Sequence, residues 1–279
     1  MKRAAKPTPK PTSRSKAGAL PLQRSLAGRV YVVTGGAKRI GRAIVLHLAA
    51  RGASIVLHVN SSRAEGQELA TALRKKGTPV ALVVGDLTHD ATPKAIVRAA
   101  RKEFGRLDGF VNNASVFHRT PEAELTVELL DQFHAVNTRA PYLCMVEAAR
   151  FMREAVRQGV QPEGRIVNLL CQSIHGPWSH YAPYCASKAG LYSLTCSLAR
   201  LYAPEVYING VAPGHVLDPS DGHRTGRDLV VDSGAAMGVG RQGRVADVVD
   251  AVLFLLEPER KISGRVIDVA LTTSEERHR

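Results

Sequence analysis

The sequence predicts an α/β protein with a single doubly wound parallel sheet and helices on both faces. Short runs rich in Val, Ile and Leu alternate with helix-length segments from Arg29 onward. The runs are apolar throughout rather than at every second residue, which is typical of parallel strands buried on both faces. A chain of 279 residues, 44% of them hydrophobic, suits one large domain. The longest apolar runs are strand-sized, so no membrane span is expected.

The elements follow one another as strand, helix, strand. Strands are expected at 30–34, 54–59, 80–85, 109–114, 165–170, 206–211 and 265–271. Helices are expected at 39–51, 63–76, 92–104, 122–156, 181–203 and about 244–256. No linker or internal repeat divides them, so 29–279 is predicted to be one domain. In such a sheet the ligand binds beyond the carboxyl ends of the strands.

The first 28 residues differ from the rest in composition. They hold seven Lys or Arg, four Pro and no acidic residue, and such a segment cannot bury enough apolar surface to fold. We expect a disordered basic tail over 1–28; a transit peptide, or weak attraction to nucleic acid or a membrane surface, are the alternatives. Of the net charge of +13, about +6 remains on the domain, which suits an anionic cofactor better than nucleic acid.

The four cysteines lack the spacing of metal ligands and follow no secretory segment. We therefore expect free thiols, a reducing compartment and a cytoplasmic location.

The first loop, V-T-G-G-A-K-R-I-G, runs from Val33 to Gly41 between a strand and a helix. Gly35 and Gly36 allow a tight turn and close approach to a pyrophosphate, whose charge the helix N-terminus would meet. Gly41 would let the helix pack closely on the strand. This is a Rossmann-type arrangement with an unusual glycine spacing, and a structural turn without a ligand is the alternative.

Five motifs occur in order: T-G-x-x-x-x-x-G, N-N-A-S at 112–115, Asn137, Y-x-x-x-K at 184–188 and V-A-P-G at 211–214. Together they resemble the short-chain dehydrogenase/reductase family. Within it, T-G-G-A-K-R-I-G-R, L-H-V-N-S-S-R, N-N-A-S-V-F and Y-A-P-Y are most similar to pteridine reductases. Arg39 stands where most members have glycine.

The end of the second strand predicts the cofactor. It reads His58, Val59, Asn60, Ser61, Ser62, with no acid before Glu65. A carboxylate there would repel a 2′-phosphate, whereas hydroxyls, an imidazole and Arg63 would bind one, so NADPH is preferred over NADH. Asn60 and Ser62 could also simply cap the next helix.

The resemblance assigns Asp86 to the adenine and Asn112 to the lining of the cofactor channel. The expected cofactor-binding set is Gly35, Lys38, Arg39, Ile40, His58, Asn60, Ser61, Ser62, Asp86, Leu87, Asn113, Ala114, Ser115, Tyr184, Lys188, Pro213 and Gly214.

Tyr184 and Lys188 are one helical turn apart and share a face. A nearby ammonium and the nicotinamide charge would lower the tyrosine pKa towards the working range, making it a proton donor. By resemblance, Lys188 also binds the nicotinamide ribose, and Asn137 holds a water of the proton relay. Cys171 occupies a position that is usually serine, or aspartate in pteridine reductases, and its thiol is a weak substitute. Ser173 could assist if the chain stays extended; the alternative is a small apolar residue in a dead site.

The resemblance also indicates the substrate pocket. Phe117 aligns with the aromatic residue that stacks on the pterin, and Arg39, Ser115 and Tyr184 complete the expected substrate contacts. Tyr181 and Trp178 could bound the pocket, and the long segment 215–240 is typical of a lid.

These assignments favour an NADPH-dependent reductase of a pterin such as dihydrobiopterin or dihydromonapterin. The alternatives are a carbonyl reductase of a ketone and a non-catalytic nucleotide-binding protein. A homotetramer built on the helices at 122–156 and 181–203 is expected by resemblance.

Overall fold

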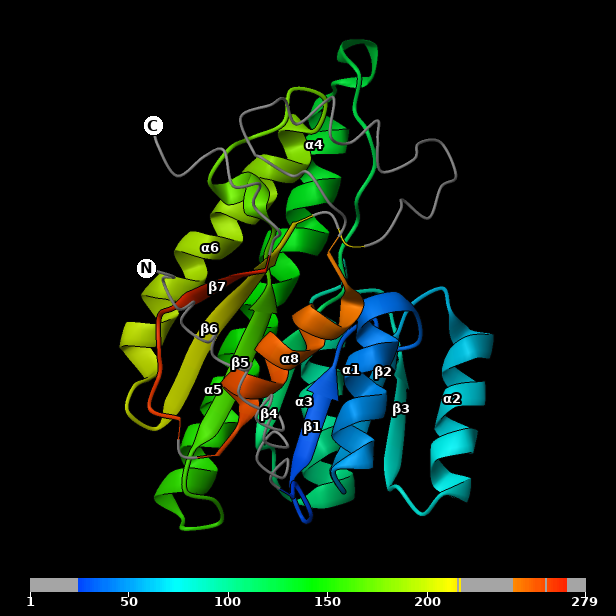
Figure 1. Ribbon diagram of the computed structural model, residues 1–279, viewed down its shortest axis with the longest axis vertical. Coiled ribbons are helices and arrows are strands. Elements are labelled where there is room, and N and C mark those ends of the chain that lie inside the picture. Colours follow the sequence, from blue (N-terminus) through cyan, green and yellow to red (C-terminus); the bar gives the residue numbers. More distant parts are fainter. Residues whose placement is uncertain (1–24, 215, 217–242, 259, 270–279) are drawn as a thin grey trace, which may run out of the picture.

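The computed structural model describes residues 25–214, 216, 243–258 and 260–269. It confirms the predicted fold: one seven-stranded parallel sheet in the order β3-β2-β1-β4-β5-β6-β7 (Figure 1). The strands are β1 Val30–Val33, β2 Ser54–Val59, β3 Val80–Val84, β4 Gly109–Asn112, β5 Gly164–Leu169, β6 Val206–Pro213 and β7 Val266–Val269. The predicted strand 265–271 thus ends at Val269 within the described residues, and the expectations for 1–24 and 217–240 lie outside them.

Helices cover both faces of the sheet (Figure 1). They are α1 Arg39–Ala50, α2 Arg63–Lys75, α3 Ala91–Phe104, α4 Val127–His134, α5 Ala140–Arg157, α6 Ala182–Tyr202 and α8 Val245–Leu256. Side chains of α1, α2 and α8 pack on one face, and those of α3, α5 and α6 pack on the other. The central strands are buried on both sides, which explains their continuous apolar sequences.

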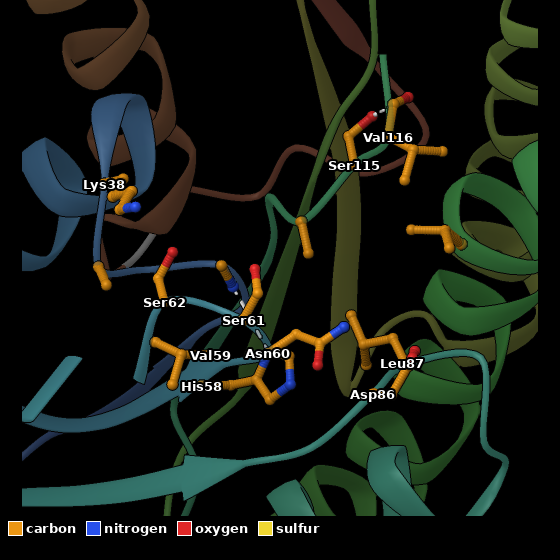
Figure 2. Close-up of a pocket in the computed structure, with 14 residues that line it drawn as sticks. Lys38, His58, Val59, Asn60, Ser61, Ser62, Asp86, Leu87, Ser115 and Val116 are labelled. Atoms are coloured by element: carbon orange, nitrogen blue, oxygen red, sulfur yellow. Dashed lines mark hydrogen bonds between the residues drawn. The ribbon is translucent and has the colours of Figure 1, made fainter. Parts of the chain in front are cut away.

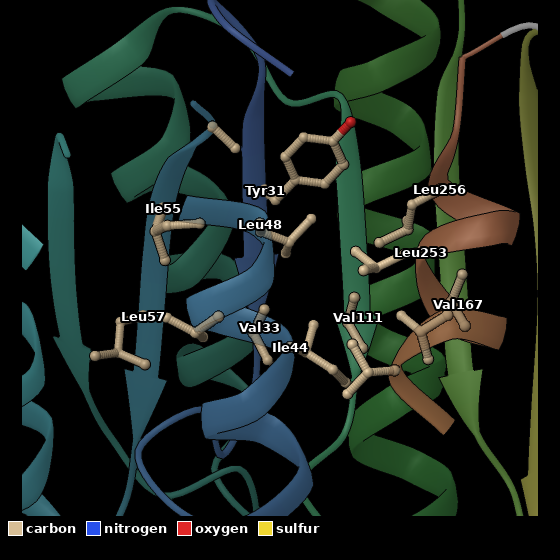
Figure 3. Packing of buried hydrophobic residues seen from close by; sticks show 14 of the residues in the cluster. Tyr31, Val33, Ile44, Leu48, Ile55, Leu57, Val111, Val167, Leu253 and Leu256 are labelled. Carbon is tan, nitrogen blue, oxygen red and sulfur yellow. The ribbon is translucent and has the colours of Figure 1, made fainter. Parts of the chain in front are cut away.

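Figure 3 shows the core beneath α1 and α8. Ile44 and Leu48 of α1 and Leu253 of α8 meet side chains that project from the sheet, including Val33 and Val111. Fully burying an aliphatic side chain of this kind contributes roughly 1.5–3 kcal/mol. The core therefore fixes β1 and β4 side by side, and β1 is the strand at which the winding reverses. Ligands bind beyond the carboxyl ends of strands at such a point.

The predicted helix over 122–156 is wrong as one unit. The structure has a short 3₁₀ turn at Glu122–Glu124, then α4, a π-helical segment at Ala135–Arg139, and α5. The break has a local cause, because Pro141 has no N–H to donate to the carbonyl of Asn137 four residues earlier. The Ala140 N–H bonds instead to the Ala135 carbonyl, five residues back.

The domain also begins earlier than predicted. Leu26 is buried in the core, and its N–H donates to the Arg51 carbonyl at 2.8 Å. The folded domain therefore includes residues 25–28, which the prediction assigned to the tail on the overall composition of residues 1–28.

No helix in the described part of the chain is long and apolar enough to cross a bilayer. Likewise, the described residues contain no group of three His, Cys, Asp or Glu side chains placed to hold a metal ion.

Candidate active site

The turn after β1 is held from the neighbouring strand. Asn113 donates its side-chain N–H groups to the carbonyls of Thr34 (2.8 Å) and Gly35 (3.2 Å). The Thr34 hydroxyl accepts from the N–H groups of Asn113 (3.0 Å) and Ala114 (3.1 Å). Gly35 has φ +62°, which favours glycine. The turn at the base of α1 is thereby rigid before any ligand binds.

The three glycines of this loop have different tasks. A side chain on Gly41 would collide with the Gly35 carbonyl and the Asn113 amide, so α1 packs closely on the turn as expected. A side chain on Gly36 would meet Leu57 at 2.6 Å. Gly36 is therefore a packing glycine beneath the turn, and Gly35 is the glycine that lines the cleft.

A cleft of about 290 Å³ opens beside this turn (Figure 2). Most residues of the expected cofactor set line it, from four loops that are far apart in sequence. They are Gly35, Lys38, His58, Asn60, Ser61, Ser62, Asp86, Leu87, Ala114 and Ser115, together with Ala37, Val59, Val116 and Val136. Hydroxyls, amide groups and one lysine at the mouth suit the adenosine end of a phosphorylated dinucleotide.

His58 does not act as predicted. Its ring is buried, with Nδ1 3.4 Å from the Gly35 N–H and Nε2 3.0 Å from the Gly85 carbonyl oxygen. Burial lowers the pKa of His58 to about 4. A neutral ring with both nitrogens engaged cannot bind a phosphate as a cation, so the predicted role of His58 as a phosphate ligand is not supported.

Asn60 and Ser62 do not cap α2 through their side chains. Ser62 is the N-cap residue but makes no side-chain capping bond. Asn60 lies within hydrogen-bond reach of Asp86. The Thr88 N–H donates to Asp86 at 2.8 Å, and this bond lowers the pKa of the carboxyl group. The Ser62 hydroxyl thus remains available to a ligand in the cleft.

Lys38, Arg39 and Ile40 begin α1 but face different surroundings. The Lys38 ammonium pairs with the Glu65 carboxylate at 2.7 Å, and both side chains are half exposed. Arg39 has φ +52°, a left-handed conformation that favours glycine, and lines an open groove with Arg42 and Glu68. Ile40 packs against the core, which leaves only its backbone for a cofactor.

Tyr184 and Lys188 lie together on α6 and are not among the residues that line the cleft. The Lys188 Nζ lies 5.7 Å from the centre of the Tyr184 ring and donates to the Leu169 carbonyl at 2.8 Å. Burial lowers the pKa of Lys188 to about 8. Burial also raises the pKa of Tyr184 well above its usual value, and the neighbouring Cys171 raises it further. The expected lowering by Lys188 is therefore not seen in the protein alone, and Tyr184 is held in its protonated, proton-donating form.

Cys171 lies beside the Tyr184 hydroxyl, where the sequence placed it. It begins a 3₁₀ turn, and its sulfur accepts from the Ser173 N–H at 3.5 Å. This turn prevents the extended path on which Ser173 could have replaced it. The Ser173 hydroxyl is buried beside Cys185 and has no well-formed hydrogen bond to the described residues.

The Asn137 side chain is fully engaged. Its oxygen accepts from the Val116 N–H (2.9 Å) and the Ser115 hydroxyl (3.0 Å), and its nitrogen donates to the Val116 carbonyl (3.0 Å) and the Ser187 hydroxyl (3.1 Å). An amide has no further capacity beyond these four bonds. Only the main-chain carbonyl of Asn137 can therefore hold the water of a proton relay.

Aromatic side chains from two loops form a wall over Tyr184. The Phe117 and Tyr181 rings stack at 5.1 Å with 6° between their planes, and Phe117 meets Tyr184 edge-on at 4.7 Å. Trp178 lies nearly parallel to Tyr184 at 6.3 Å. The structure thus places Phe117 beside Tyr184, as expected, but one face of the Phe117 ring is covered by Tyr181.

Three assignments remain. Pro213 ends β6, and the Gly214 N–H is bonded to the Val269 carbonyl at 2.9 Å, so both lie at the carboxyl edge of the sheet. Asn112 does not line the channel, because it is buried and bonded to Asn168 at 2.8 Å inside the sheet. Sequence reasoning missed Thr34 and Cys185; the signal for Thr34 was a polar residue closing an apolar strand.

The sequence profile of the family described as short chain dehydrogenase matches residues 29–225. The chain belongs to the short-chain dehydrogenase family. It is an NAD(P)-dependent oxidoreductase of that family, in agreement with the glycine turn, the cleft and the Tyr184/Lys188 pair.

Relatives named for particular substrates are about one-third identical. NADPH-dependent aldehyde reductase 2, chloroplastic, of Arabidopsis thaliana is 31% identical over 87% of this chain and 92% of its own length. Hydroxynaphthalene reductase-like protein Arp2 of Metarhizium brunneum is 32% identical, covering 88% and 94% respectively. The crystal structure of a dehydrogenase/reductase from Sinorhizobium meliloti superposes with a TM-score of 0.75 at 29% identity, covering 88% of this chain and 94% of that one.

Proposed function

We propose that this short-chain dehydrogenase uses NADPH to reduce a flat bicyclic substrate, with a pterin as the first candidate. The observation that carries the proposal is the wall of Phe117, Tyr181 and Trp178 beside Tyr184. Such rings favour a planar substrate, because stacked aromatic pairs gain about 0.5–1.5 kcal/mol beyond burial. The similarity of T-G-G-A-K-R-I-G-R and N-N-A-S-V-F to pteridine reductases supports the pterin.

NADPH is proposed over NADH because of the cleft. Asn60, Ser61 and Ser62 follow β2 without an acidic residue, and Lys38 lies across the mouth. The name of the Arabidopsis relative points the same way. We expect NADPH to bind at least tenfold more tightly than NADH, a difference of about 1.4 kcal/mol. Equal dissociation constants would contradict this choice.

The reaction needs a hydride, which the reduced nicotinamide supplies when it is bound. The chain provides the proton. Tyr184 is protonated at neutral pH, since its pKa is raised, and it can donate its proton to the oxygen or nitrogen bonded to the carbon that accepts the hydride. The Lys188 ammonium can return a proton to Tyr184 through water, and the Asn137 carbonyl can accept a hydrogen bond from that water. Cys171, beside the hydroxyl, offers a weaker hydrogen bond than the serine it replaces.

A carbonyl reductase is the second candidate. The aldehyde and hydroxynaphthalene named in the relatives support it, and a hydroxynaphthalene-type substrate is also flat and aromatic. Arg39 favours the pterin over this alternative only through the family resemblance.

One assay separates these candidates. NADPH oxidation is measured with dihydropterins, fully oxidised pterins, aryl ketones and aliphatic aldehydes. Turnover on dihydropterins above all others is expected, whereas turnover on aryl ketones alone would select the carbonyl reductase. NADPH binding without turnover on any compound would favour the non-catalytic alternative. Tyr184→Phe is the control, because it must abolish most of any genuine turnover.

We further propose a cytoplasmic homotetramer. All four cysteines are free thiols, and α4, α5 and α6 expose large apolar side chains at Val127, Leu130, Tyr142, Tyr192 and Leu201. Large apolar side chains exposed on several neighbouring helices are consistent with an interface between subunits. Light scattering at micromolar concentration is expected to give four times the mass of the chain, and a monomer would refute the assembly.

A further inference from the structure

The imidazole ring of His58 lies between two loops of the cleft and makes a hydrogen bond to each of them. His58 is the last residue but one of β2 and is 1% exposed. On one side lies the turn after β1: the Gly36 N–H donates to the His58 carbonyl at 3.1 Å, and the Gly35 N–H points at His58 Nδ1 at 3.4 Å. On the other side, His58 Nε2 lies 3.0 Å from the Gly85 carbonyl oxygen at the end of β3.

These contacts define one tautomer. A carbonyl oxygen only accepts, so Nε2 must carry the proton. Nδ1 then holds a lone pair and accepts from the Gly35 N–H, which can only donate. A protonated ring would set an Nδ1–H against the Gly35 N–H and lose that bond. The neutral ring is therefore the form that satisfies both sides.

The two bonded segments carry different parts of the cleft. Gly35 belongs to the turn that would receive the pyrophosphate, while Gly85 directly precedes Asp86 and Leu87, which line the adenosine end. Figure 2 shows His58 among Asn60, Asp86 and Leu87 on the floor of the cleft. β1 and β3 are not neighbours in the sheet, because β2 lies between them. The His58 ring supplies a side-chain link across that gap.

We propose that His58 is a positioning residue that sets the separation of the pyrophosphate turn and the adenosine-binding loop, and so controls how well the two ends of the dinucleotide bind together. This inference rests on the proposed binding of NADPH in the cleft. It assigns no contact between an imidazolium and the 2′-phosphate.

Three variants remove the two hydrogen bonds of the His58 ring, separately or together. His58→Gln keeps a donor near Nε2 for Gly85 but loses the acceptor for Gly35. His58→Asn keeps an acceptor near Nδ1 but cannot reach Gly85. His58→Phe keeps the ring and loses both bonds. Val56→Ala, a buried change two residues earlier on β2, serves as the matched control for general loss of stability.

Dissociation constants are measured for NADPH, which spans both ends, and for 2′,5′-ADP, which occupies only the adenosine end. Losing one hydrogen bond is expected to cost about tenfold in affinity. His58→Gln should raise the dissociation constant of NADPH by about tenfold and that of 2′,5′-ADP by less than about threefold. His58→Asn should raise the dissociation constants of both ligands by the same factor. His58→Phe should raise both, and that of NADPH by the larger factor. Val56→Ala should change neither constant, although it lowers the melting temperature.

Equal weakening of both ligands by His58→Gln, or the same pattern in Val56→Ala, would overturn the proposal. If the wild-type protein prefers NADH, the NADPH proposal fails, and the series is repeated with NADH and 5′-AMP, which tests His58 independently. As a second readout, nitrogen-15 NMR spectra of the His58 imidazole should show the Nε2–H tautomer. The ring should stay largely neutral above pH 5, because burial lowers its pKa to about 4, although the nearby Asp86 carboxylate acts to raise it. The Nδ1–H tautomer would contradict the proposed link.

Discussion

Individual side chains at this site show how burial governs chemistry. Tyr184 and Lys188 are both buried, and burial moves their pKa values in opposite directions, because each group is pushed towards its uncharged form. The pair is therefore set for proton donation by a neutral phenol rather than for proton removal. Their roles can be separated by substitution.

The first prediction concerns the proton donor. Tyr184→Phe removes the donated proton, and general acid catalysis contributes about 10²- to 10⁴-fold, so turnover at saturating NADPH should fall by that order. Cys171→Ala removes only a weak thiol hydrogen bond and should cost less than about tenfold. NADPH affinity, measured by fluorescence, serves as the control for both variants. Equal losses in the two variants would make the cysteine a chemical participant.

Lys188 gives a prediction of stability against pH. Its folded-state pKa of about 8 lies below the usual value of about 10.4, so below pH 8 the folded protein bears the full cost of the buried charge. That cost disappears as the pH rises from 8 to about 10.4. Lys188→Met removes this cost but also removes the hydrogen bond to the Leu169 carbonyl. The net effect at pH 7 should be a stabilisation of the fold by about 2 kcal/mol. The gain, measured by urea unfolding, should shrink by pH 10. The exposed Lys75→Met is the matched control, and a gain independent of pH would contradict this account.

Arg39 links backbone conformation to substrate choice. A non-glycine residue at φ +52° is strained by about 1–2 kcal/mol, so Arg39→Gly relieves strain while making the unfolded chain more flexible. We expect stability to change by less than about 1 kcal/mol and pterin turnover to fall. Arg42→Gly, which removes the same charge from the regular part of α1, should instead destabilise by about 1 kcal/mol. Thermal unfolding measures the stability of both variants. A larger loss of stability in Arg39→Gly than in Arg42→Gly would show that the backbone at Arg39 is not strained.

At the scale of elements, the sequence located nearly every strand and helix but not the interruption between α4 and α5. The strands were predictable because buried parallel strands have continuous apolar sequences. The π-helical segment was missed because apolar side chains recur at helical spacing on both sides of it. The one local signal was Pro141, whose missing N–H affects the carbonyl of Asn137, a residue already assigned to the site.

Pro141→Ala tests this interruption. It restores an N–H that can bond to the Asn137 carbonyl, so the relay water would lose its partner. Turnover is expected to fall by about tenfold, as for the loss of one hydrogen bond in the reaction, with little change in NADPH affinity. Pro79→Ala, directly before β3 and so at the end of that strand opposite the cleft, is the control. Undiminished turnover in Pro141→Ala would exclude the Asn137 carbonyl from the relay.

At the scale of the whole molecule, the fold and many of the residues that line the cleft were predictable, but the surroundings of several residues were not. The motif order placed Gly35, Asn60 and Asp86 at one cleft, because the carboxyl ends of parallel strands converge. Whether His58 binds phosphate or links two loops depends on the partners of its two nitrogens. Those partners come from β1 and β3, and no local pattern encodes them.

The start of the domain gives the last prediction. Leu26 is 1% exposed, packs in the core beneath α1, and has its N–H bonded to the Arg51 carbonyl. Removing residues 1–28 deletes this leucine, whereas removing residues 1–24 keeps it. Burying a leucine contributes roughly 1.5–3 kcal/mol. In urea unfolding, the chain without residues 1–28 should therefore be less stable by about that amount than the chain without residues 1–24. Leu26→Ala in the full chain should reproduce a similar loss, about 2–3 kcal/mol. Turnover of the chain that starts at Ser25 should match the full protein, because no residue of the described site precedes it. Equal stability of the two truncated chains would place the start of the folded domain after Gly28, as the composition of the sequence had indicated.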